Sequence, residues 1–174
     1  MNSIQLSELP QTALLNKYKG QNAYTDCYSV VVPRAISHSE YVEAFYSTPL
    51  FRVERFILAT LVSRPSTDIQ TKQLVSGEVE TFAAWSVEDR AENQLLLCDF
   101  LGRTRSWLMS DPSEQFNPAS TRLYFGSAVV PKIEPKTSRA SYCFAFHAML
   151  GFHRLYSRAL LRSAVSRLAR LHIN

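Results

Sequence analysis

The chain has 174 residues, of which 46% are hydrophobic and 20% are charged. This composition suits one domain with a buried core and excludes global disorder. The first residues lack the basic start and apolar run of a signal peptide, and no apolar stretch approaches the roughly 20 residues that cross a bilayer. The 3 cysteines are widely spaced and odd in number, which argues against a disulfide framework. We therefore expect a cytoplasmic protein without a transmembrane segment.

The net charge of +4 is unevenly distributed along the chain. All 15 acidic residues lie at or before Glu134, and every charged residue after it is lysine or arginine. Any contact with an anionic partner is therefore expected in the C-terminal segment.

The first part of the chain predicts a lead-in, a strand and a helix. Residues 1–23 mix polar side chains with one short apolar patch, which predicts a partly ordered lead-in with a short helix. Residues 24–33 are rich in β-branched and aromatic side chains, and we expect the first strand there. Ser37 and Glu40 have the spacing of a capping box, which predicts a short helix that ends at Tyr46.

Two more helices are expected before the rest of the sheet. Pro49 suits the first position of a helix, which ends at Arg64 because a proline follows it. Residues 67–76 predict a third helix, which Gly77 ends.

Strands dominate the next part of the chain. Turns are expected at residues 89–93 and at Gly102 with Arg103, and polar loops at residues 111–119 and 131–138. The four expected strands span residues 80–88, 94–101, 104–109 and 121–130.

The C-terminal segment predicts one long helix. From residue 139 to about residue 173 it contains neither proline nor acid, and a helix of that length measures about 45 Å. The order of all these elements predicts an α+β fold in which helices cover one face of a curved antiparallel sheet. We expect residues 24–174 to form this single domain.

The long helix has a continuous seam at steps of three and four residues. Two of its members, His153 and Ser157, are polar and lie one turn apart. They are either a core histidine with a serine that helps to satisfy it, which is the commoner arrangement, or a polar pair facing a ligand cavity. The seam comprises Phe146, Leu150, His153, Ser157, Leu160, Ala164, Leu168 and Leu171.

Arg154, Arg158 and Arg162 form a stripe beside this seam. We expect the stripe to be solvated or paired with acidic residues elsewhere in the chain, because a charged helix face usually lies in solvent. The alternative is contact with an anion, a membrane surface or nucleic acid. No aromatic side chains are interleaved with these arginines, so nucleic acid is not an expected partner.

One face of the predicted sheet gathers aromatic side chains around an arginine. If the turn at Gly102 has two residues, Arg105 and Trp107 share a face, and an even-length turn before this hairpin adds Trp85 to it. Such a face suits a packed core or an apolar pocket with one fixed charge. A buried arginine needs an acidic partner or a bound anion, and Asp99 lies on the opposite face in this register. The pairs predicted across the hairpin are Phe100 with Arg105 and Cys98 with Trp107.

Motifs of the common enzyme classes are absent from the sequence. The 5 glycines form neither a phosphate-binding loop nor a dinucleotide fingerprint, and no zinc-protease or nucleophile-elbow pattern occurs. Cys143 and His147 share one helix face and could be half of a metal site, but zinc takes three or four protein ligands, and packing is the favoured explanation. We therefore expect no metal and no cofactor, and a non-enzymatic function is favoured.

Five stretches of the sequence are QLLLCDFLGRTRSWLM, TRLYFGSAVVP, LGFHRLYSRALLR, PSTDIQ and FAAWSVE. Together they resemble the uncharacterised bacterial family called domain of unknown function 2867, over residues 24–171. That family is grouped with the Bet v 1-like, or START-like, superfamily. The resemblance implies a helix-grip fold, in which a curved antiparallel sheet packs on a long C-terminal helix. It implies no catalytic residues, and the helix at residues 67–76 is an addition to that fold.

The leading hypothesis is a domain that binds a small apolar or amphipathic molecule between the sheet and the long helix, with Arg105 meeting an acidic head group. One alternative is an enzyme of the polyketide cyclase or aromatase type, with His153 or Tyr124 as acid or base. Another is an interaction domain that uses the basic helix. The expected ligand-binding residues are Trp85, Arg105, Trp107, Tyr124, Phe146, Leu150, His153 and Ser157.

Overall fold

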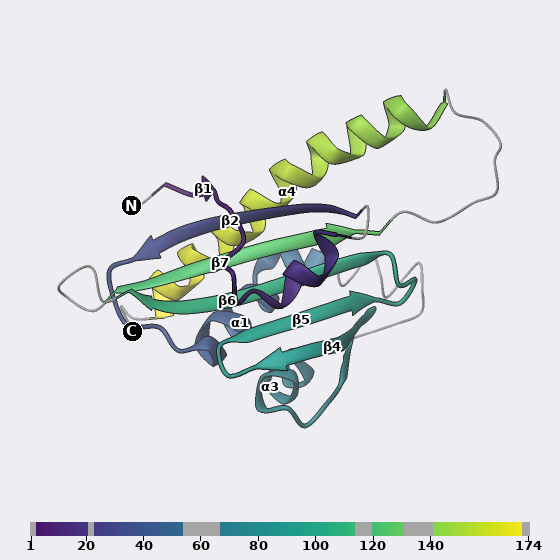
Figure 1. The fold of residues 1–174 in the computed structure, drawn as a ribbon. Coiled ribbons are helices and arrows are strands. Elements are labelled where there is room, and N and C mark those ends of the chain that lie inside the picture. The colour runs from purple at the N-terminus through teal and green to yellow at the C-terminus, as the bar shows by residue number, and fades with distance from the viewer. Residues whose placement is uncertain (1–2, 21–22, 54–66, 114–119, 131–140, 172–174) are drawn as a thin grey trace.

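The fold is α+β, as predicted: an open, curved antiparallel sheet packs against a long C-terminal helix and a few short helices, consistent with a helix grip (Figure 1). The predicted loop at residues 131–138 and the helix expected up to Arg64 lie wholly or partly outside the described residues. For Asp68, Ser113 and the part of the last helix before Arg154, only the backbone is described. The computed structural model describes residues 3–20, 23–53, 67–113, 120–130 and 141–171.

Within these residues, seven antiparallel strands form one sheet in the order β1-β2-β7-β6-β5-β4-β3. The first long strand, β2, pairs along its whole length with the last strand, β7. Strands from the start and the end of the sheet's chain order are therefore neighbours inside the sheet. The strands are β1 (Gln5–Leu6), β2 (Tyr24–Val32), β3 (Thr81–Phe82), β4 (Trp85–Ala91), β5 (Gln94–Asp99), β6 (Thr104–Ser113) and β7 (Ser120–Val129).

Several predicted boundaries are wrong: β4 continues to Ala91, into the turn expected at residues 89–93, and β5 ends at Asp99 rather than at residue 101. Two further differences involve β3 and β6. The strand expected at residues 80–88 is a hairpin of β3 and β4, with a tight turn at Ala83 and Ala84. The loop expected from residue 111 begins as strand, because β6 continues to Ser113 and stays paired with β7. In both places the pairing with a neighbouring strand, rather than local side-chain polarity, decides where the strand runs.

Replacing Ala83 with glycine will raise the free energy of unfolding by about 1 kcal/mol. Ala83 has a φ of +54°, and among the described residues no other non-glycine residue has a positive φ. In that backbone region the Cβ atom crowds the following carbonyl oxygen, and glycine removes the crowding. Urea unfolding measures the change. Ala84→Gly is the control, and it should destabilise the protein because the Ala84 methyl group is buried.

The helices begin and end at the predicted caps. Helix α1 (His38–Tyr46) starts in the predicted capping box: the Glu40 N–H donates to the Ser37 hydroxyl at 3.2 Å, and the Ser37 N–H donates to the Glu40 carboxylate at 2.8 Å. Helix α3 (Asp68–Ser76) ends at Gly77, whose φ is +79°. Residues 49–53 are helical, as expected after Pro49. Helix α4 (Ser141–Leu171) is the predicted long helix.

Both faces of the sheet are covered. Helices α1, α3 and α4 lie behind the sheet in Figure 1, and we call this side the helix face. Residues 7–20, which follow the edge strand β1 and include the 3₁₀ helix η1 (Leu14–Tyr18), cross the opposite side, which we call the N-terminal face. Side chains alternate between the two cores: Leu95 and Leu97 of β5 point to the helix face, and Leu96 points to the N-terminal face.

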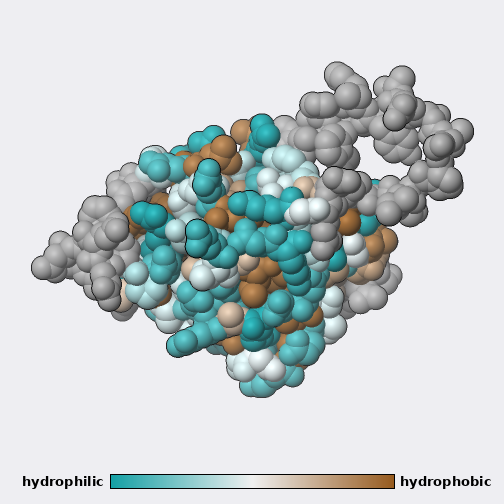
Figure 2. All heavy atoms as spheres, viewed as in Figure 1, coloured by the Kyte–Doolittle hydropathy of each residue, from teal (hydrophilic) through white to brown (hydrophobic). Residues whose placement is uncertain are grey.

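The N-terminal face has a core of its own. Trp107 and Met109 of β6 are buried there together with Leu15 of η1. Figure 2 shows this side of the molecule, whose visible surface is mainly hydrophilic with small hydrophobic areas between. The N-terminal segment therefore covers apolar side chains that the sheet would otherwise expose to water.

Candidate functional site

Trp85 lies on the helix face, which is not the face predicted for it. A β-bulge between Val87 and Asp89 shifts the pairing of β4 with β5 by one residue, so that Trp85 pairs with Asp99. A shift of one residue reverses the face of every side chain beyond it. The prediction that Trp85 and Trp107 share a face is therefore wrong.

The turn between β5 and β6 is longer than the predicted two residues. Arg105 pairs with Cys98 rather than with Phe100. The Asp99 carboxylate closes the longer turn by accepting hydrogen bonds from two backbone N–H groups, at 2.6 and 3.0 Å. Because the register differs by two residues, the predicted partners are wrong, whereas the prediction that Arg105 and Trp107 share a face is confirmed.

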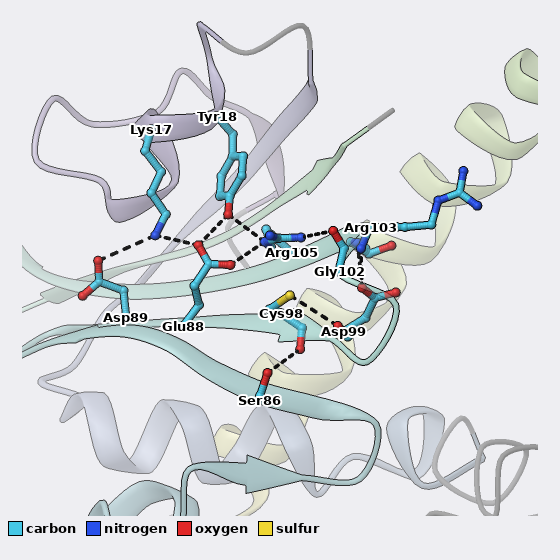
Figure 3. Close-up of polar contacts among 11 residues, drawn as sticks. Lys17, Tyr18, Ser86, Glu88, Asp89, Cys98, Asp99, Gly102, Arg103 and Arg105 are labelled. Carbon is cyan, nitrogen blue, oxygen red and sulfur yellow. Dashed lines mark hydrogen bonds and ion pairs between the residues drawn. The ribbon is translucent and has the colours of Figure 1, made fainter. Parts of the chain in front are cut away.

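Arg105 has an acidic partner within the protein (Figure 3). Its Nε lies 2.5 Å from Glu88 Oε2 and also donates to the Tyr18 hydroxyl, at 2.8 Å. The Tyr18 hydroxyl donates to Glu88 Oε1 at 2.5 Å, and the Lys17 ammonium lies 2.6 Å from the same oxygen. Arg105 Nη1 donates to the Gly102 carbonyl at 2.7 Å. This ion cluster joins η1 to strands β4 and β6.

The charged groups of the ion cluster pair and hydrogen-bond with one another. Burial alone would raise the pKa of Glu88, but hydrogen bonds from Lys17 and Tyr18 and the charge of Arg105 outweigh it, so this pKa lies below its ordinary 4.5. Burial, and then the hydrogen bond to Glu88, raise the pKa of Tyr18 to about 12. The guanidinium of Arg105 therefore has a protein carboxylate as its partner.

Trp107 and Tyr124 lie beneath the N-terminal segment. Trp107 is fully buried, and its Nε1 donates to Gln94 Oε1 at 2.9 Å. The same amide oxygen accepts from the Leu14 N–H at 2.9 Å, and Gln94 Nε2 donates to the Thr12 carbonyl at 3.0 Å. A buried, satisfied amide thus ties the segment to the sheet, and both aromatic side chains belong to a covered core.

The predicted seam of α4 is confirmed over most of the helix whose side chains are described. Ser157, Leu160, Ala164 and Leu168 are buried. The prediction for Leu171 is wrong, because it is 62% exposed. The side chains of Phe146, Leu150 and His153, and those of Cys143 and His147, lie outside the described part of the structure.

A cavity of about 250 Å³ that is partly open to solvent lies on the helix face, between the sheet and α4. Trp85 and Ser157 line it, so the structure brings together two of the residues predicted for a ligand site. Arg105, Trp107 and Tyr124 lie on the opposite face and do not reach it. The cavity also has lining residues that were not predicted as site residues: Phe45, Phe51, Asp99, Phe100, Ser106 and Phe125.

Two residues that line the cavity each carry a buried polar atom without a hydrogen-bond partner among the described residues. Trp85 Nε1 and Ser157 Oγ are both buried and unpaired, and Ser157 is 1% exposed. The Ser106 hydroxyl, in contrast, is hydrogen-bonded to the Tyr46 hydroxyl at 3.1 Å. Buried polar groups without a partner are rare, and each costs about 1–3 kcal/mol. The unpaired atoms therefore mark this cavity as the candidate functional site.

The described lining side chains offer apolar contact and hydrogen bonds. Asp99 is the charged residue among them, and Tyr156 adds a phenol. Tyr124, one of the two residues named for an enzymatic acid or base, lies on the other side of the sheet. Within the described residues, no three His, Cys, Asp or Glu side chains are grouped so that they could hold a metal ion.

The arginine stripe of α4 faces solvent, as predicted. Arg154, Arg158 and Arg162 are exposed. The Nε of Arg154 donates to the Tyr24 hydroxyl at 3.0 Å, and its guanidinium lies 5.9 Å from the centroid of that ring. None of the helices in the described part of the chain combines the length and the apolar character of a membrane span.

A Ser157→Ala variant will be about 1 kcal/mol more stable than the wild type. The substitution removes a buried hydroxyl that makes no hydrogen bond. Urea unfolding of the ligand-free protein measures the gain. Ser163→Ala on the same helix isolates the better helix propensity of alanine, and its gain should be smaller.

Ser106→Ala is the matched control within the cavity. It removes a hydroxyl that is hydrogen-bonded to buried Tyr46, so the protein should lose about 1 kcal/mol. Losses of equal size for Ser157→Ala and Ser106→Ala would contradict the assignment of Ser157 as an unpaired group.

Comparisons with known proteins identify no family for this chain. No family model, no curated protein and no solved structure matches it. The resemblance to the domain-of-unknown-function family therefore stays a prediction, whereas the fold class rests on the structure itself.

Proposed function

We propose that this chain binds a small, largely apolar molecule in the cavity between the sheet and α4. The observation that carries the proposal is that Trp85 Nε1 and Ser157 Oγ are both buried without partners in the wall of one cavity. A bound molecule that hydrogen-bonds to them removes the cost of leaving them unpaired.

The apolar part of the wall supports the same proposal. Phe45, Phe51 and Phe125 line the cavity beside the two unpaired polar atoms. Walls that are mainly aromatic, with a few placed polar groups, are typical of small-molecule sites. The space of about 250 Å³ is large enough for a small molecule of one or two rings.

Titration with cumene, a neutral apolar probe, tests the proposal. The chain has 2 tryptophans, so a proton–nitrogen NMR spectrum contains two indole N–H signals. Trp85 lies in the cavity wall and Trp107 is buried on the opposite face. We expect cumene to shift the Trp85 signal saturably and to leave the Trp107 signal in place.

Ser157→Leu fills the cavity and should abolish the cumene response, while Ser163→Leu on the same helix should preserve it. The Trp107 signal reports in each case that the sheet is folded. Mass spectrometry should detect a small molecule retained through purification in Ser163→Leu and not in Ser157→Leu. If neither cumene nor a small molecule retained through purification reaches the cavity, the cavity is not a binding site.

A further inference from the structure

We infer that the ligand of this cavity is an uncharged molecule that presents a hydrogen-bond acceptor oxygen to Trp85 and Ser157. This inference rests on the proposed function and names the chemical class of its ligand. It differs from the sequence-based expectation of an acidic head group, because Arg105 lies on the other face and is paired with Glu88.

The two unpaired atoms indicate that the ligand carries a hydrogen-bond acceptor. The indole N–H of Trp85 can only donate a hydrogen bond. The Ser157 hydroxyl carries a proton that has no acceptor among the described residues. An uncharged acceptor, such as a carbonyl, hydroxyl or ether oxygen, can bind either donor, whereas a purely apolar ligand satisfies neither.

The charge on the cavity wall decides against an anion. Among the described lining residues, Asp99 is the charged one, and no lysine or arginine accompanies it there. A carboxylate ligand would lie near a like charge without a cation beside it, and this repulsion weakens its binding. Asp99 already accepts hydrogen bonds from the N–H groups of Arg103 and Thr104, so the loop itself partly neutralises it.

The size of the cavity limits the ligand further. Its volume of about 250 Å³ lies just below the roughly 300–1,000 Å³ of pockets for drug-sized molecules. A molecule of one or two rings fits this space better than a long acyl chain does.

Four probes of nearly equal shape separate these requirements. Acetophenone carries an acceptor oxygen, cumene has none, benzoate is an anion and α-methylbenzylamine is a cation. We expect acetophenone to move the Trp85 indole proton downfield, as a new hydrogen bond requires, and cumene to shift it without that downfield change. Benzoate should bind more weakly than acetophenone, and Asp99→Asn should strengthen benzoate binding about tenfold relative to acetophenone.

Two variants test the donors directly. In Trp85→Phe and in Ser157→Ala, the affinity ratio of acetophenone to cumene should fall by about tenfold, because one hydrogen bond is lost while the apolar contacts remain. Comparing the ratio within each protein cancels the different hydrophobicities of the probes. Because Trp85→Phe removes the reporter signal, calorimetry measures the affinities of this variant.

The outcomes distinguish the inference from the proposed function. If the ratio is unchanged in both variants, or benzoate binds as tightly as acetophenone, the inference is wrong while the cavity remains a binding site. If the amine binds most tightly and Asp99→Asn abolishes its binding, the site is a cation receptor and the inference is also wrong. If no probe reaches the cavity, the proposed function itself fails, and the inference fails with it.

Discussion

A Leu15→Ala variant will have a free energy of unfolding about 3 kcal/mol below that of the wild type. Leu15 lies in η1 and is fully buried in the core of the N-terminal face. Its Cδ2 lies 2.9 Å from the position that a Cβ atom on Gly126 would take, so the leucine fills the space above this glycine of β7. Truncation to alanine leaves a void between η1 and the sheet. Urea unfolding followed by circular dichroism measures the loss.

Leu6→Ala is the matched control in the same segment. Leu6 is 73% exposed, and its truncation should change the stability by no more than about 0.5 kcal/mol. Gly126→Ala disturbs the same contact from the other side, because the new methyl group would lie 2.8 Å from Trp107 Cε3 and 2.9 Å from Leu15 Cδ2. It should also destabilise the protein. A Leu15→Ala loss as small as that of Leu6→Ala would show that η1 contributes nothing to the core.

Local signals predicted the helices well, because caps act over only a few residues. The capping box of Ser37 and Glu40 and the stop at Gly77 are confirmed by the structure. The seam of α4 was also predictable, since helical periodicity placed Ser157 beside Leu160 and Ala164 on the buried side. Ser157 therefore lay within reach of sequence analysis as a cavity residue.

The pairing register of the strands and the packing of the N-terminal segment over the sheet depend on distant parts of the chain, and neither was predictable. The bulge at Val87 has no periodic signal, yet it moved Trp85 to the helix face and thereby into the cavity. Trp85 was correctly predicted to line the cavity but was expected on the same face as Trp107, which lies on the other side. The acidic partner of Arg105 was not predictable, because Glu88 lies on β4 and Arg105 on β6, with β5 between them.

Replacing Glu88 with glutamine will lower the free energy of unfolding by about 2 kcal/mol at neutral pH. Glutamine keeps the size of the side chain but leaves Arg105 and Lys17 facing an uncharged group. The side chains of Arg105 and Glu88 are 13% and 20% exposed. Because solvent screens them in part, the expected loss is below the about 3–5 kcal/mol for breaking a fully buried pair.

The stability lost in Glu88→Gln should depend on pH, because the pKa of Glu88 differs between the folded and unfolded states. This pKa is lower in the folded protein than its ordinary 4.5, so the carboxylate stabilises the fold above that pH and the contribution is lost as the pH falls through the lowered value. Tyr18 acts at the alkaline end. Its pKa is raised from 10 to about 12, so its neutral phenol stabilises the fold below pH 10, and this contribution is lost as the pH rises towards 12.

Urea unfolding of the wild type, Glu88→Gln and Asp89→Asn, from neutral pH down to below 4.5, tests this account. The difference between the wild type and Glu88→Gln should be largest at neutral pH and shrink on acidification. Asp89 is the matched control, because its carboxylate lies 3.8 Å from the Lys17 ammonium and is more exposed, so its neutralisation should cost about 0.5 kcal/mol or less. An equal Glu88→Gln loss at every pH would mean that the shape of Glu88, rather than its charge, holds η1 against the sheet.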